Sequence, residues 1–295
     1  MFKSGFISIA GKPNVGKSTL LNAFLGQKIA AVSPKPQTTR SQITGVVTNE
    51  DSQLVFIDTP GIHEAKNKLG QYMNKEAFSG ADGADIILYL VAADRCNPEA
   101  EAEIIKKISC ENIILVINKT DAVEKQDILP LIASLSGLAD FREIVPVSAK
   151  CGDGVDSLIK IIEGYLPEGP KFFPDDTLTD QPERQICAEF IREKMMRCLN
   201  NEIPYGTAVM IESMKYDDEK NLTSVEAVIY CERESHKAII IGKKGEMLKK
   251  IGTNARYDIQ KFTGTKVYLN LWVKVKENWR NSEVSLKNFG YNENK

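Results

Sequence analysis

The sequence predicts an α/β protein of two domains, with a mostly parallel sheet covered by helices first and a smaller α+β domain second. Three observations predict it. Residues 1–166 alternate short apolar runs with helical patterns, a segment rich in proline and acids follows, and the rest mixes helices with a hairpin. The 295 residues also suit two domains, since one domain typically takes ~100–200 residues.

In the first domain, five apolar runs predict strands and five amphipathic stretches predict helices. Near-continuous apolar strands that alternate with helices are typical of a parallel sheet covered on both faces. The predicted strands are Gly5–Ala10, Gln53–Asp58, Asp85–Ala93, Asn112–Asn118 and Ile144–Val147. The predicted helices are Lys17–Leu25, Leu69–Ser79, Pro98–Ile108 with Asn97 as its cap, Asp127–Leu135 and Val155–Leu166.

The segment from Leu166 to Pro182 marks the domain boundary, because its four prolines and its acidic residues oppose regular structure. We place the first domain at 1–168, a linker at 169–182 and the second domain at 183–295. The second domain is expected to contain a helix, a hairpin, a further helix ending near Phe262, and a last strand. Their ranges are Glu183–Leu199, Thr207–Met214 with Ser224–Cys231 around a turn at Asp217–Asn221, and Lys266–Val275.

Composition places the chain among ordinary globular proteins, with 42% apolar and 26% charged residues. The longest strongly apolar run, Ile86–Ala93, is far shorter than the ~20 residues of a membrane span. The N-terminus enters patterned sequence at once, which predicts no signal peptide. Six scattered cysteines fit reduced thiols. We therefore expect a cytoplasmic protein.

Charge differs between the two halves. Residues 1–181 hold 18 basic and 24 acidic residues, and residues 182–295 hold 20 and 16. Within 236–276 there are ten basic residues and only two acids, Glu246 and Asp258. A local basic block is typical of a polyanion-binding surface or of a solvated face.

Residues 11–18, Gly-Lys-Pro-Asn-Val-Gly-Lys-Ser, match the pattern GxxxxGK(S/T) between a predicted strand and a predicted helix. The backbone N–H groups of such a loop wrap a β-phosphate, and the helix N-terminus adds its positive dipole end. Lys17 is expected to reach the β- and γ-phosphates and Ser18 to ligate Mg²⁺.

Three further motifs follow predicted strands in order: Asp58-Thr-Pro-Gly61, Asn118-Lys-Thr-Asp121 and Ser148-Ala-Lys150. Asp58 is expected to hold Mg²⁺ through water, and the Gly61 N–H to sense the γ-phosphate. The carboxylate of Asp121 can accept two hydrogen bonds from guanine, whereas adenine lacks the exocyclic amine at that edge. The Ala149 N–H is expected to meet guanine O6.

This motif set resembles that of the Ras-like P-loop GTPases. The resemblance implies a GTP/GDP site with Mg²⁺, and it identifies residues 37–40, Gln-Thr-Thr-Arg, as the first switch loop. In these GTPases a switch threonine reaches Mg²⁺, and the sequence does not choose between Thr38 and Thr39. The expected catalytic residues are Lys17, Thr39 and Gly61, and the expected metal ligands are Ser18, Thr38, Thr39 and Asp58. The expected nucleotide-binding residues are Gly11, Asn14, Val15, Gly16, Lys17, Ser18, Thr19, Asp58, Gly61, Asn118, Lys119, Asp121, Ser148, Ala149 and Lys150.

The hydrolytic step departs from the Ras pattern. Ile62 stands where Ras has its water-orienting glutamine, and an isoleucine has no polar atom for that role, so slow intrinsic hydrolysis is expected. Asn14 resembles the asparagine of potassium-activated GTPases, and K⁺ is therefore a candidate cofactor; the alternative is that Asn14 braces the loop. His63 is left out of the catalytic residues, because a lone histidine in a switch is more often solvated.

In the second domain, Ile241-Gly242-Lys243-Lys244-Gly245 resembles the GxxG signature of KH domains. We expect this segment to lie in a strand–helix–strand arrangement. There the glycines let the backbone approach about four single-stranded nucleotides. Lys243 and Lys244 are expected to supply counter-charge, and the neighbouring strand to bond splayed bases. The alternative is a turn before a helix with two solvated lysines. The resemblance is to the type II-like KH arrangement.

One GTPase domain followed by one KH domain resembles a bacterial family of ribosome-assembly GTPases over nearly the whole chain. The resemblance rests on residues 13–22, 36–40, 202–206 and the GxxG. It implies binding to the 3′ end of 16S rRNA and to the 30S subunit, no DNA partner, a monomer, and a cytoplasmic location with peripheral association at the inner face of the cell membrane.

Two other functions are compatible with the motifs. One is a GTP-switched signalling or membrane-linked protein whose second domain binds protein rather than RNA. The other is an RNA-binding protein with a vestigial nucleotide site, which the intact lysine, serine and aspartates oppose. Related factors with two GTPase domains repeat the whole motif set, which this chain does not.

Overall fold

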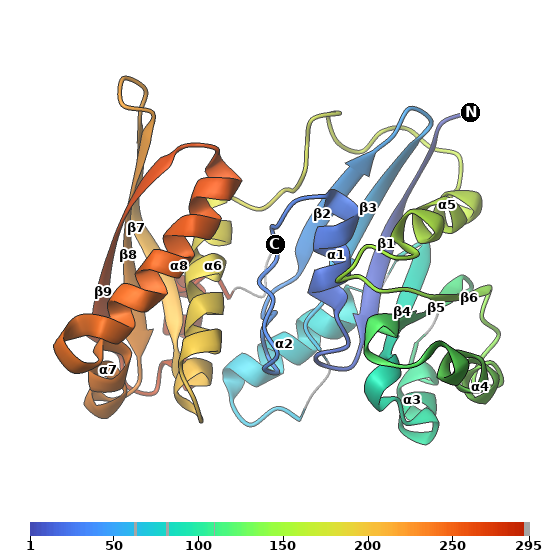
Figure 1. Cartoon of the computed structure of the whole chain (residues 1–295), viewed down its shortest axis with the longest axis horizontal. Helices are drawn as coiled ribbons and strands as arrows, with labels where there is room; N and C mark the ends of the chain where they lie inside the picture. Colours follow the sequence, from blue (N-terminus) through green and yellow to red (C-terminus); the bar gives the residue numbers. More distant parts are fainter. Residues whose placement is uncertain (62–63, 81–82, 109, 292–295) are drawn as a thin grey trace. The chain divides into compact units, whose positions relative to one another are not determined.

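The chain divides into two compact units in the computed structural model, which describes residues 1–61, 64–80, 83–108 and 110–291 (Figure 1). The first unit comprises residues 1–28, 39–63 and 73–180. The second comprises residues 29–38, 64–72 and 181–295. Two short segments of the N-terminal half therefore group with the C-terminal half. The predicted domain limits, 1–168 and 183–295, remain a prediction.

A six-stranded sheet of order β2-β3-β1-β4-β5-β6 forms the centre of the first unit. Its neighbouring strands pair in parallel except β2 and β3, which are antiparallel, so the predicted mostly parallel sheet is confirmed. The five predicted strands are present, and β2 is an additional edge strand. The strands are β1 (Lys3–Gly11), β2 (Ile43–Thr48), β3 (Ser52–Asp58), β4 (Ile86–Ala92), β5 (Ile113–Asn118) and β6 (Glu143–Pro146).

Helices connect these strands at the predicted places. Asn97 caps α3 as expected, since its side chain accepts hydrogen bonds from the N–H groups of Glu99 and Ala100 at 3.1 and 3.4 Å. The helices are α1 (Lys17–Leu25), α2 (Lys68–Ser79), α3 (Pro98–Ile105), α4 (Lys125–Leu135) and α5 (Val155–Tyr165), with 3-10 turns η1 (Ala93–Arg95) and η2 (Thr120–Ala122).

The helices α3 and α4 pack on one face of the sheet. Ile105 of α3 and Leu135 of α4 join Tyr89, Leu115 and Ile117 of the central strands in one buried cluster. Because β1, β4 and β5 are held side by side under these helices, their C-terminal ends meet along one sheet edge, where ligands of open α/β sheets bind.

The proline-rich segment after α5 contains no helix or strand but is tied to the first unit. Gln53 accepts hydrogen bonds from the N–H groups of Phe172 and Phe173 at 2.7 and 3.0 Å. The N–H of Val46 on β2 donates to the carbonyl of Leu178 at 2.9 Å. The segment therefore packs along the β2–β3 side of the sheet.

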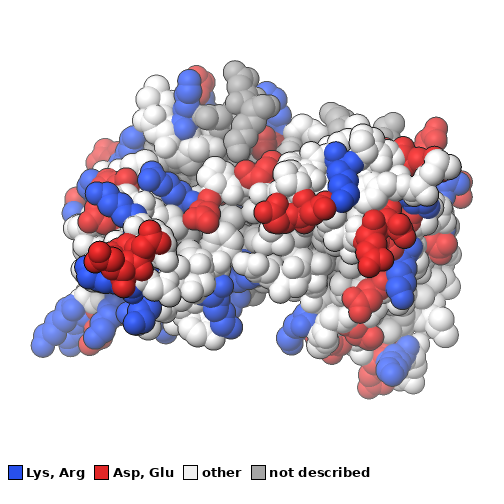
Figure 2. All heavy atoms as spheres, turned by 90° about the horizontal axis from the view of Figure 1, so that it is seen from above, with Lys and Arg blue, Asp and Glu red and all other residues white. Residues whose placement is uncertain are grey.

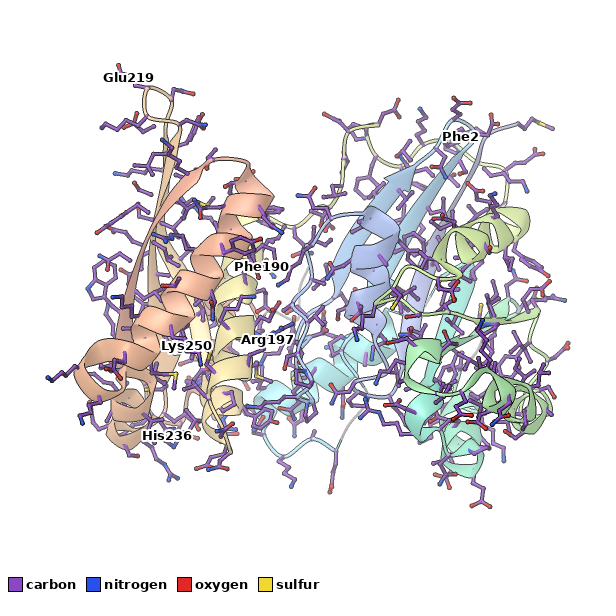
Figure 3. The ribbon with its side chains drawn as sticks, viewed as in Figure 1. Phe2, Phe190, Arg197, Glu219, His236 and Lys250 are labelled. Atoms are coloured by element: carbon purple, nitrogen blue, oxygen red, sulfur yellow. The ribbon has the colours of Figure 1, made fainter. Side chains whose placement is uncertain are left out.

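The second unit packs helices on one face of a three-stranded sheet of order β7-β8-β9, in which β7 and β8 are antiparallel and β8 and β9 parallel. Glu219 lies at the tip of the β7–β8 hairpin, and Phe190 of α6 lies in the helical layer (Figure 3). The elements are α6 (Glu183–Cys198), η3 (Ile203–Gly206), β7 (Ala208–Asp217), β8 (Leu222–Cys231), α7 (Glu234–Ile241), η4 (Lys243–Gly245), α8 (Glu246–Thr263), β9 (Lys266–Val275), η5 (Trp279–Asn281) and α9 (Glu283–Asn288).

The Gly-Lys-Lys-Gly segment lies between two helices, α7 and α8, so the strand–helix–strand surroundings expected for it are wrong. The short apolar run Ala238–Ile241 before this segment forms the end of α7, where Ile240 is fully buried and Ile239 is 49% exposed. A short apolar run does not by its periodicity distinguish a strand from a buried part of a helix, and here it belongs to α7.

Three consecutive charged residues of α6, Arg192, Glu193 and Lys194, are buried in the second unit. Glu193 accepts the Val32 N–H at 3.0 Å and pairs with Lys194 at 2.9 Å, and Arg192 donates to the Thr38 carbonyl. Burial of such charges is tolerated only with close partners. Here segment 29–38 supplies part of them.

Across the described part of the chain, no helix combines the length and apolar character needed to cross a bilayer.

Candidate functional site: a nucleotide-binding loop and a GxxG groove

The loop between β1 and α1 is compact and depends on its two glycines. Gly11 has φ of 141° and Gly16 has φ of 103°. A Cβ on Gly11 would lie 2.4 Å from the Leu90 carbonyl oxygen, and one on Gly16 would lie 2.2 Å from Asn118 Nδ2. The backbone conformation and the lack of space therefore both require glycine. Gly16 directly precedes the first turn of α1, so the loop ends at a helix N-terminus.

Lys17 and Asp58 are both buried, and their opposite charges attract each other. Lys17 Nζ donates to the carbonyls of Gly11 and Lys12 at 3.0 and 3.1 Å. Burial lowers the pKa of Lys17 to about 8, opposed by the Asp58 carboxylate. Burial likewise raises the pKa of Asp58 to about 6, opposed by the Lys17 ammonium and by hydroxyl donors. A bound polyphosphate and a cation would give both groups stronger counter-charges.

Three oxygen-bearing side chains meet at the C-terminal end of β3. Ser18 Oγ lies 2.6 Å from Asp58 Oδ2 and 2.8 Å from Thr39 Oγ1. Within the described residues, the other Asp58 oxygen, Oδ1, is buried and lacks a hydrogen-bond partner. A hard cation such as Mg²⁺ suits this set, because it prefers hydroxyl and carboxylate oxygens and would satisfy the unpartnered one.

The two candidate switch threonines differ in position. Thr39 Oγ1 belongs to the oxygen cluster with Ser18 and Asp58, whereas Thr38 Oγ1 donates to the Lys35 carbonyl at 2.7 Å. The geometry therefore associates Thr39, and not Thr38, with the candidate metal ligands.

Gly61 lies directly against the phosphate-loop sequence. A Cβ on Gly61 would approach three atoms of Pro13 to 2.8–2.9 Å, so this close approach also requires glycine. The predictions for Ile62 and His63 lie outside the described residues.

Asn118 joins the base-recognition motif to the loop. Its Nδ2 donates to the Val15 carbonyl at 2.9 Å, and its Oδ1 accepts from the N–H groups of Lys119 and Ala149 at 2.8 and 3.0 Å. One buried amide thus fixes three segments that are far apart in the sequence.

Asn14 lies at the tip of the loop with φ of 63°, and Thr19 lies half-buried in the first turn of α1.

Asp121 is held by the third motif. Ser148 Oγ donates to Asp121 Oδ1 at 2.7 Å, and Lys150 Nζ lies 3.7 Å from Oδ2. The Ser148 hydroxyl is the main cause of the lowered pKa of Asp121. The structure therefore brings the loop, the carboxylate at the end of β3 and the two base motifs to one sheet edge, as the sequence predicts.

In the second unit, the backbone turns sharply between α7 and α8. Gly242, Lys244 and Gly245 have φ of 74°, 50° and 80°. A Cβ on Gly242 would lie 2.7 Å from the Cβ of Met247. The side chains of Lys243 and Lys244 are exposed, and Ile241 is half-buried.

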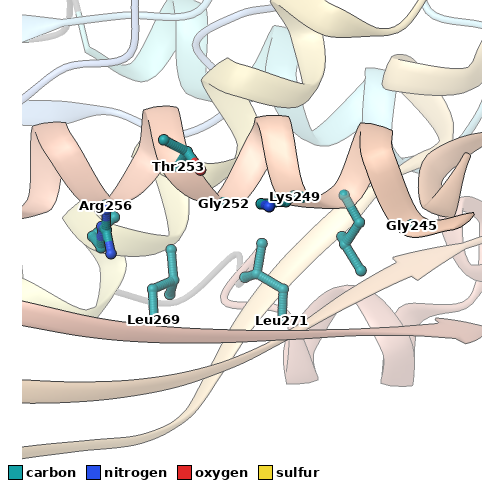
Figure 4. A pocket seen from close by; sticks show the side chains of 8 residues that line it. Gly245, Lys249, Gly252, Thr253, Arg256, Leu269 and Leu271 are labelled. Atoms are coloured by element: carbon teal, nitrogen blue, oxygen red, sulfur yellow. The ribbon is translucent and has the colours of Figure 1, made fainter.

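A cavity of about 330 Å³ opens beside this turn, between α8 and β9 (Figure 4). Its lining combines small, apolar and basic residues: Gly245, Leu248, Lys249, Gly252, Thr253, Arg256, Leu269 and Leu271. On the face drawn in Figure 2, basic and acidic side chains are interspersed. Two of the ten basic residues of 236–276, Lys249 and Arg256, line this groove.

The RNA-binding residues predicted from the sequence end at Gly245 and do not include the rest of this lining. A signal was present: Gly245, Lys249, Gly252 and Arg256 recur every three or four residues, which places them on one face of a helix. Leu269 and Leu271 alternate on β9 and therefore point to one face of the sheet.

The fold and these sites define a P-loop GTPase domain joined to a KH domain. A family model described as "50S ribosome-binding GTPase" matches residues 6–119, and a KH-domain model matches residues 202–280.

Two bacterial relatives align with nearly the full chain. It is 52% identical to GTPase Era of Clostridioides difficile strain 630 over 99% of this chain and 100% of that protein, and 51% identical to GTPase Era of Geobacter metallireducens over 98% of each. The chain belongs to the GTPase Era family, the bacterial family that its motifs resemble, and it is therefore a GTPase that converts GTP to GDP and phosphate.

Two solved structures match the whole fold at 42% identity. An Aquifex aeolicus Era variant bound to GDP·AlF4⁻ gives a TM-score of 0.92 over 98% of this chain and 99% of that one. Era in complex with MgGDPNP and nucleotides 1506–1542 of 16S ribosomal RNA gives 0.93 over 99% of both chains.

Proposed function

We propose that the protein is a GTP-controlled factor that holds the single-stranded 3′ end of 16S rRNA and acts in assembly of the 30S ribosomal subunit. The observation that carries the proposal is the cavity between α8 and β9, which opens beside the Gly-Lys-Lys-Gly turn. A relative of the same fold was solved in complex with nucleotides 1506–1542 of 16S ribosomal RNA, which supports the choice of RNA.

The cavity suits unpaired nucleotides. Leu248, Leu269 and Leu271 offer apolar surface to bases, and Lys249 and Arg256 supply positive charge for phosphates. Gly252 keeps the groove open, because a Cβ there would already lie 3.3 Å from Leu271 Cδ1. The unstacked bases of a single strand can lie against such a lining, so single strands are the expected ligand.

In the first unit, we assign the loop N–H groups and Lys17 to the β- and γ-phosphates, and Asp121 to the guanine edge. The Ala149 N–H donates to Asn118 Oδ1 at 3.0 Å, so it supports this edge through Asn118. Ser18, Thr39 and Asp58 would hold Mg²⁺. When bound, Mg²⁺ neutralises charge that develops on the phosphate oxygens. Lys17 adds a fixed positive charge on the same oxygens, and the Gly61 N–H can donate to the γ-phosphate. These contacts make the site sensitive to loss of that phosphate.

The family resemblance also implies a monomer in the cytoplasm that associates peripherally with the inner face of the cell membrane.

Charge reversal tests the RNA assignment. Replacement of Lys243 and Lys244 by Asp places two negative charges against the bound strand, so affinity for a 16S 3′-end oligonucleotide should fall by at least roughly tenfold, while GTP binding stays unchanged. Filter binding at several salt concentrations measures this. The matched control replaces Lys215 and Lys220, exposed on the β7–β8 hairpin, by Asp.

A second variant removes space without changing charge. Gly252→Val should fill the groove and weaken RNA binding to a similar degree. If the charge-reversal and Gly252→Val variants bind RNA as the wild type does, the RNA assignment is wrong and a protein partner for the second unit becomes the better proposal.

A further inference from the structure

A buried carboxylate outside all nucleotide motifs, Glu101, lies in the first turn of α3 and is only 3% exposed. Its two oxygens have different partners. Oε2 accepts from the Tyr89 hydroxyl at 2.6 Å, and Oε1 pairs with Lys12 Nζ at 2.8 Å. Burial and the bond to Glu101 raise the pKa of Tyr89, so its hydroxyl remains the donor. An apolar residue would fill this space at lower desolvation cost, so packing alone does not explain the carboxylate.

Lys12 connects Glu101 to the phosphate loop. It is the second residue of the loop, and its backbone carbonyl is one of the two that accept from Lys17 Nζ. Its side chain, in contrast, leaves the loop and ends on α3 at Glu101. The position of this end of the loop is therefore tied to α3.

Arg95 of η1 supplies a second contact from the same segment of the chain. Its Nη2 donates to the carbonyl of Asn14 at 2.9 Å, at the tip of the loop. Asp94 lies 3.7 Å from Arg95 Nε and 3.6 Å from Lys119 Nζ through the same oxygen, Oδ1. The loop tip is thus connected to the lysine of the base motif.

Together, these contacts and the bond from Asn118 hold the carbonyls of the phosphate loop. The carbonyls of loop residues 11, 12, 14 and 15 accept bonds from Lys17, Arg95 and Asn118 side chains. Carbonyls that are engaged in this way leave the N–H groups of a loop available on its concave side, where they bind anions.

We propose that Glu101 and Arg95 are positioning residues that hold the phosphate loop in its nucleotide-binding conformation before the nucleotide arrives. Both act through the loop, Glu101 by way of Lys12 and Arg95 by way of the Asn14 carbonyl. Pre-organisation of this kind increases affinity because less ordering is left to occur on binding. The inference rests on the nucleotide site proposed above.

The test separates positioning from stability. In the double variant Tyr89→Phe/Glu101→Leu, both buried polar groups are replaced by apolar ones, so the fold should remain stable while Lys12 loses its anchor. We expect the nucleotide-free melting temperature to stay within about 3 °C of the wild type. Affinity for fluorescent GDP should fall by roughly tenfold, mainly through faster dissociation.

Three further variants complete the design. Tyr89→Phe alone keeps the Glu101–Lys12 pair and should bind GDP as the wild type does, even if its melting temperature falls. Arg95→Ala should weaken GDP binding, and Arg95→Lys, which can still donate to the Asn14 carbonyl, should restore part of it.

Wild-type GDP affinity in the double variant and in Arg95→Ala would overturn the inference. So would a loss of affinity that follows melting temperature across all variants, Tyr89→Phe included. Lys17→Ala in the same assay distinguishes a failure of the positioning role from a failure of the proposed nucleotide site. If Lys17→Ala loses GDP binding while the double variant keeps it, the nucleotide site stands and the positioning role fails.

Discussion

The side-chain amide of Asn118 donates a 2.9 Å hydrogen bond to the backbone carbonyl of Val15, and so fixes the base-recognition motif to the phosphate loop. Their proximity leaves no room for a side chain at Gly16, whose Cβ would lie 2.2 Å from the same amide nitrogen. The phosphate-binding and base-binding parts of the site are therefore joined directly by contacts within the protein.

Guanine selectivity should depend on Asp121. Asp121→Asn should weaken GTP binding strongly and shift preference toward xanthosine triphosphate, because the C2 oxygen of xanthine can accept a hydrogen bond from the new amide. Titration with fluorescent GTP, ATP and XTP measures the preference. Glu124→Gln, the same change at an exposed neighbouring position, is the control and should behave as the wild type. An unchanged preference for GTP in Asp121→Asn would refute this assignment.

Potassium should accelerate GTP hydrolysis if the Asn14 side-chain carbonyl helps to ligate a monovalent cation near the β–γ bridge. Such a cation supplies positive charge where an arginine finger acts in other GTPases. We expect turnover to be several-fold faster in K⁺ than in Na⁺ at equal ionic strength, and Asn14→Ala to remove the difference. Equal rates in the two salts would reject the cation role and favour RNA or the ribosome as activator.

The attachment of segment 29–38 to α6 should depend on Glu193. In Glu193→Gln the carboxylate that accepts the Val32 N–H and pairs with Lys194 loses its charge, which leaves buried cations undercompensated. The free energy of unfolding should fall by about 3 kcal/mol, and amide exchange at Val32 should become faster. Mass-spectrometric hydrogen exchange checks the second effect, with Glu202→Gln as an exposed control. Unchanged exchange at Val32 would contradict the contact.

Cysteine reactivity should separate the exposed Cys151 from the buried Cys187. Burial, with a smaller effect of Glu183, raises the pKa of Cys187 to about 12, so almost no thiolate forms at pH 8. Iodoacetamide should therefore label Cys151 in the folded protein and Cys187 only in denaturant, as read by peptide mass spectrometry. Because the folded state holds the Cys187 proton more tightly than the unfolded state, the free energy of unfolding falls as pH rises from 9 toward 12. Labelling of both thiols at equal rates in the folded protein would disagree.

Much of the nucleotide site is predictable because its motifs follow parallel strands. The C-terminal ends of β1, β3 and β5 meet at one edge, so Gly11, Asp58 and Asn118 converge once the strands are recognised. In the predicted helix Glu183–Leu199, the apolar residues recur at helical spacing and are buried in the structure: Ile186, Phe190, Ile191, Met195 and Leu199. Here the local pattern and the tertiary structure agree.

Other features depend on partners that lie far away in the sequence. The edge strand β2 (Ile43–Thr48) pairs on one side only and mixes Thr and Gly with its apolar residues, so its periodicity is weak. Charged side chains are ordinarily exposed, whereas Arg192, Glu193 and Lys194 are buried, and residues 29–38 supply part of their contacts. The roles of Glu101 and Arg95 likewise follow from side-chain contacts and not from a motif.

Crosslinking in cells followed by sequencing of the bound RNA tests the central claim most directly. If the groove between α8 and β9 holds the 3′ end of 16S rRNA, reads should concentrate there, crosslinked peptides should come from α8 and β9, and the variant with Lys243 and Lys244 replaced by Asp should lose the signal. Reads spread over unrelated transcripts, or a signal that the variant retains in full, would contradict the account.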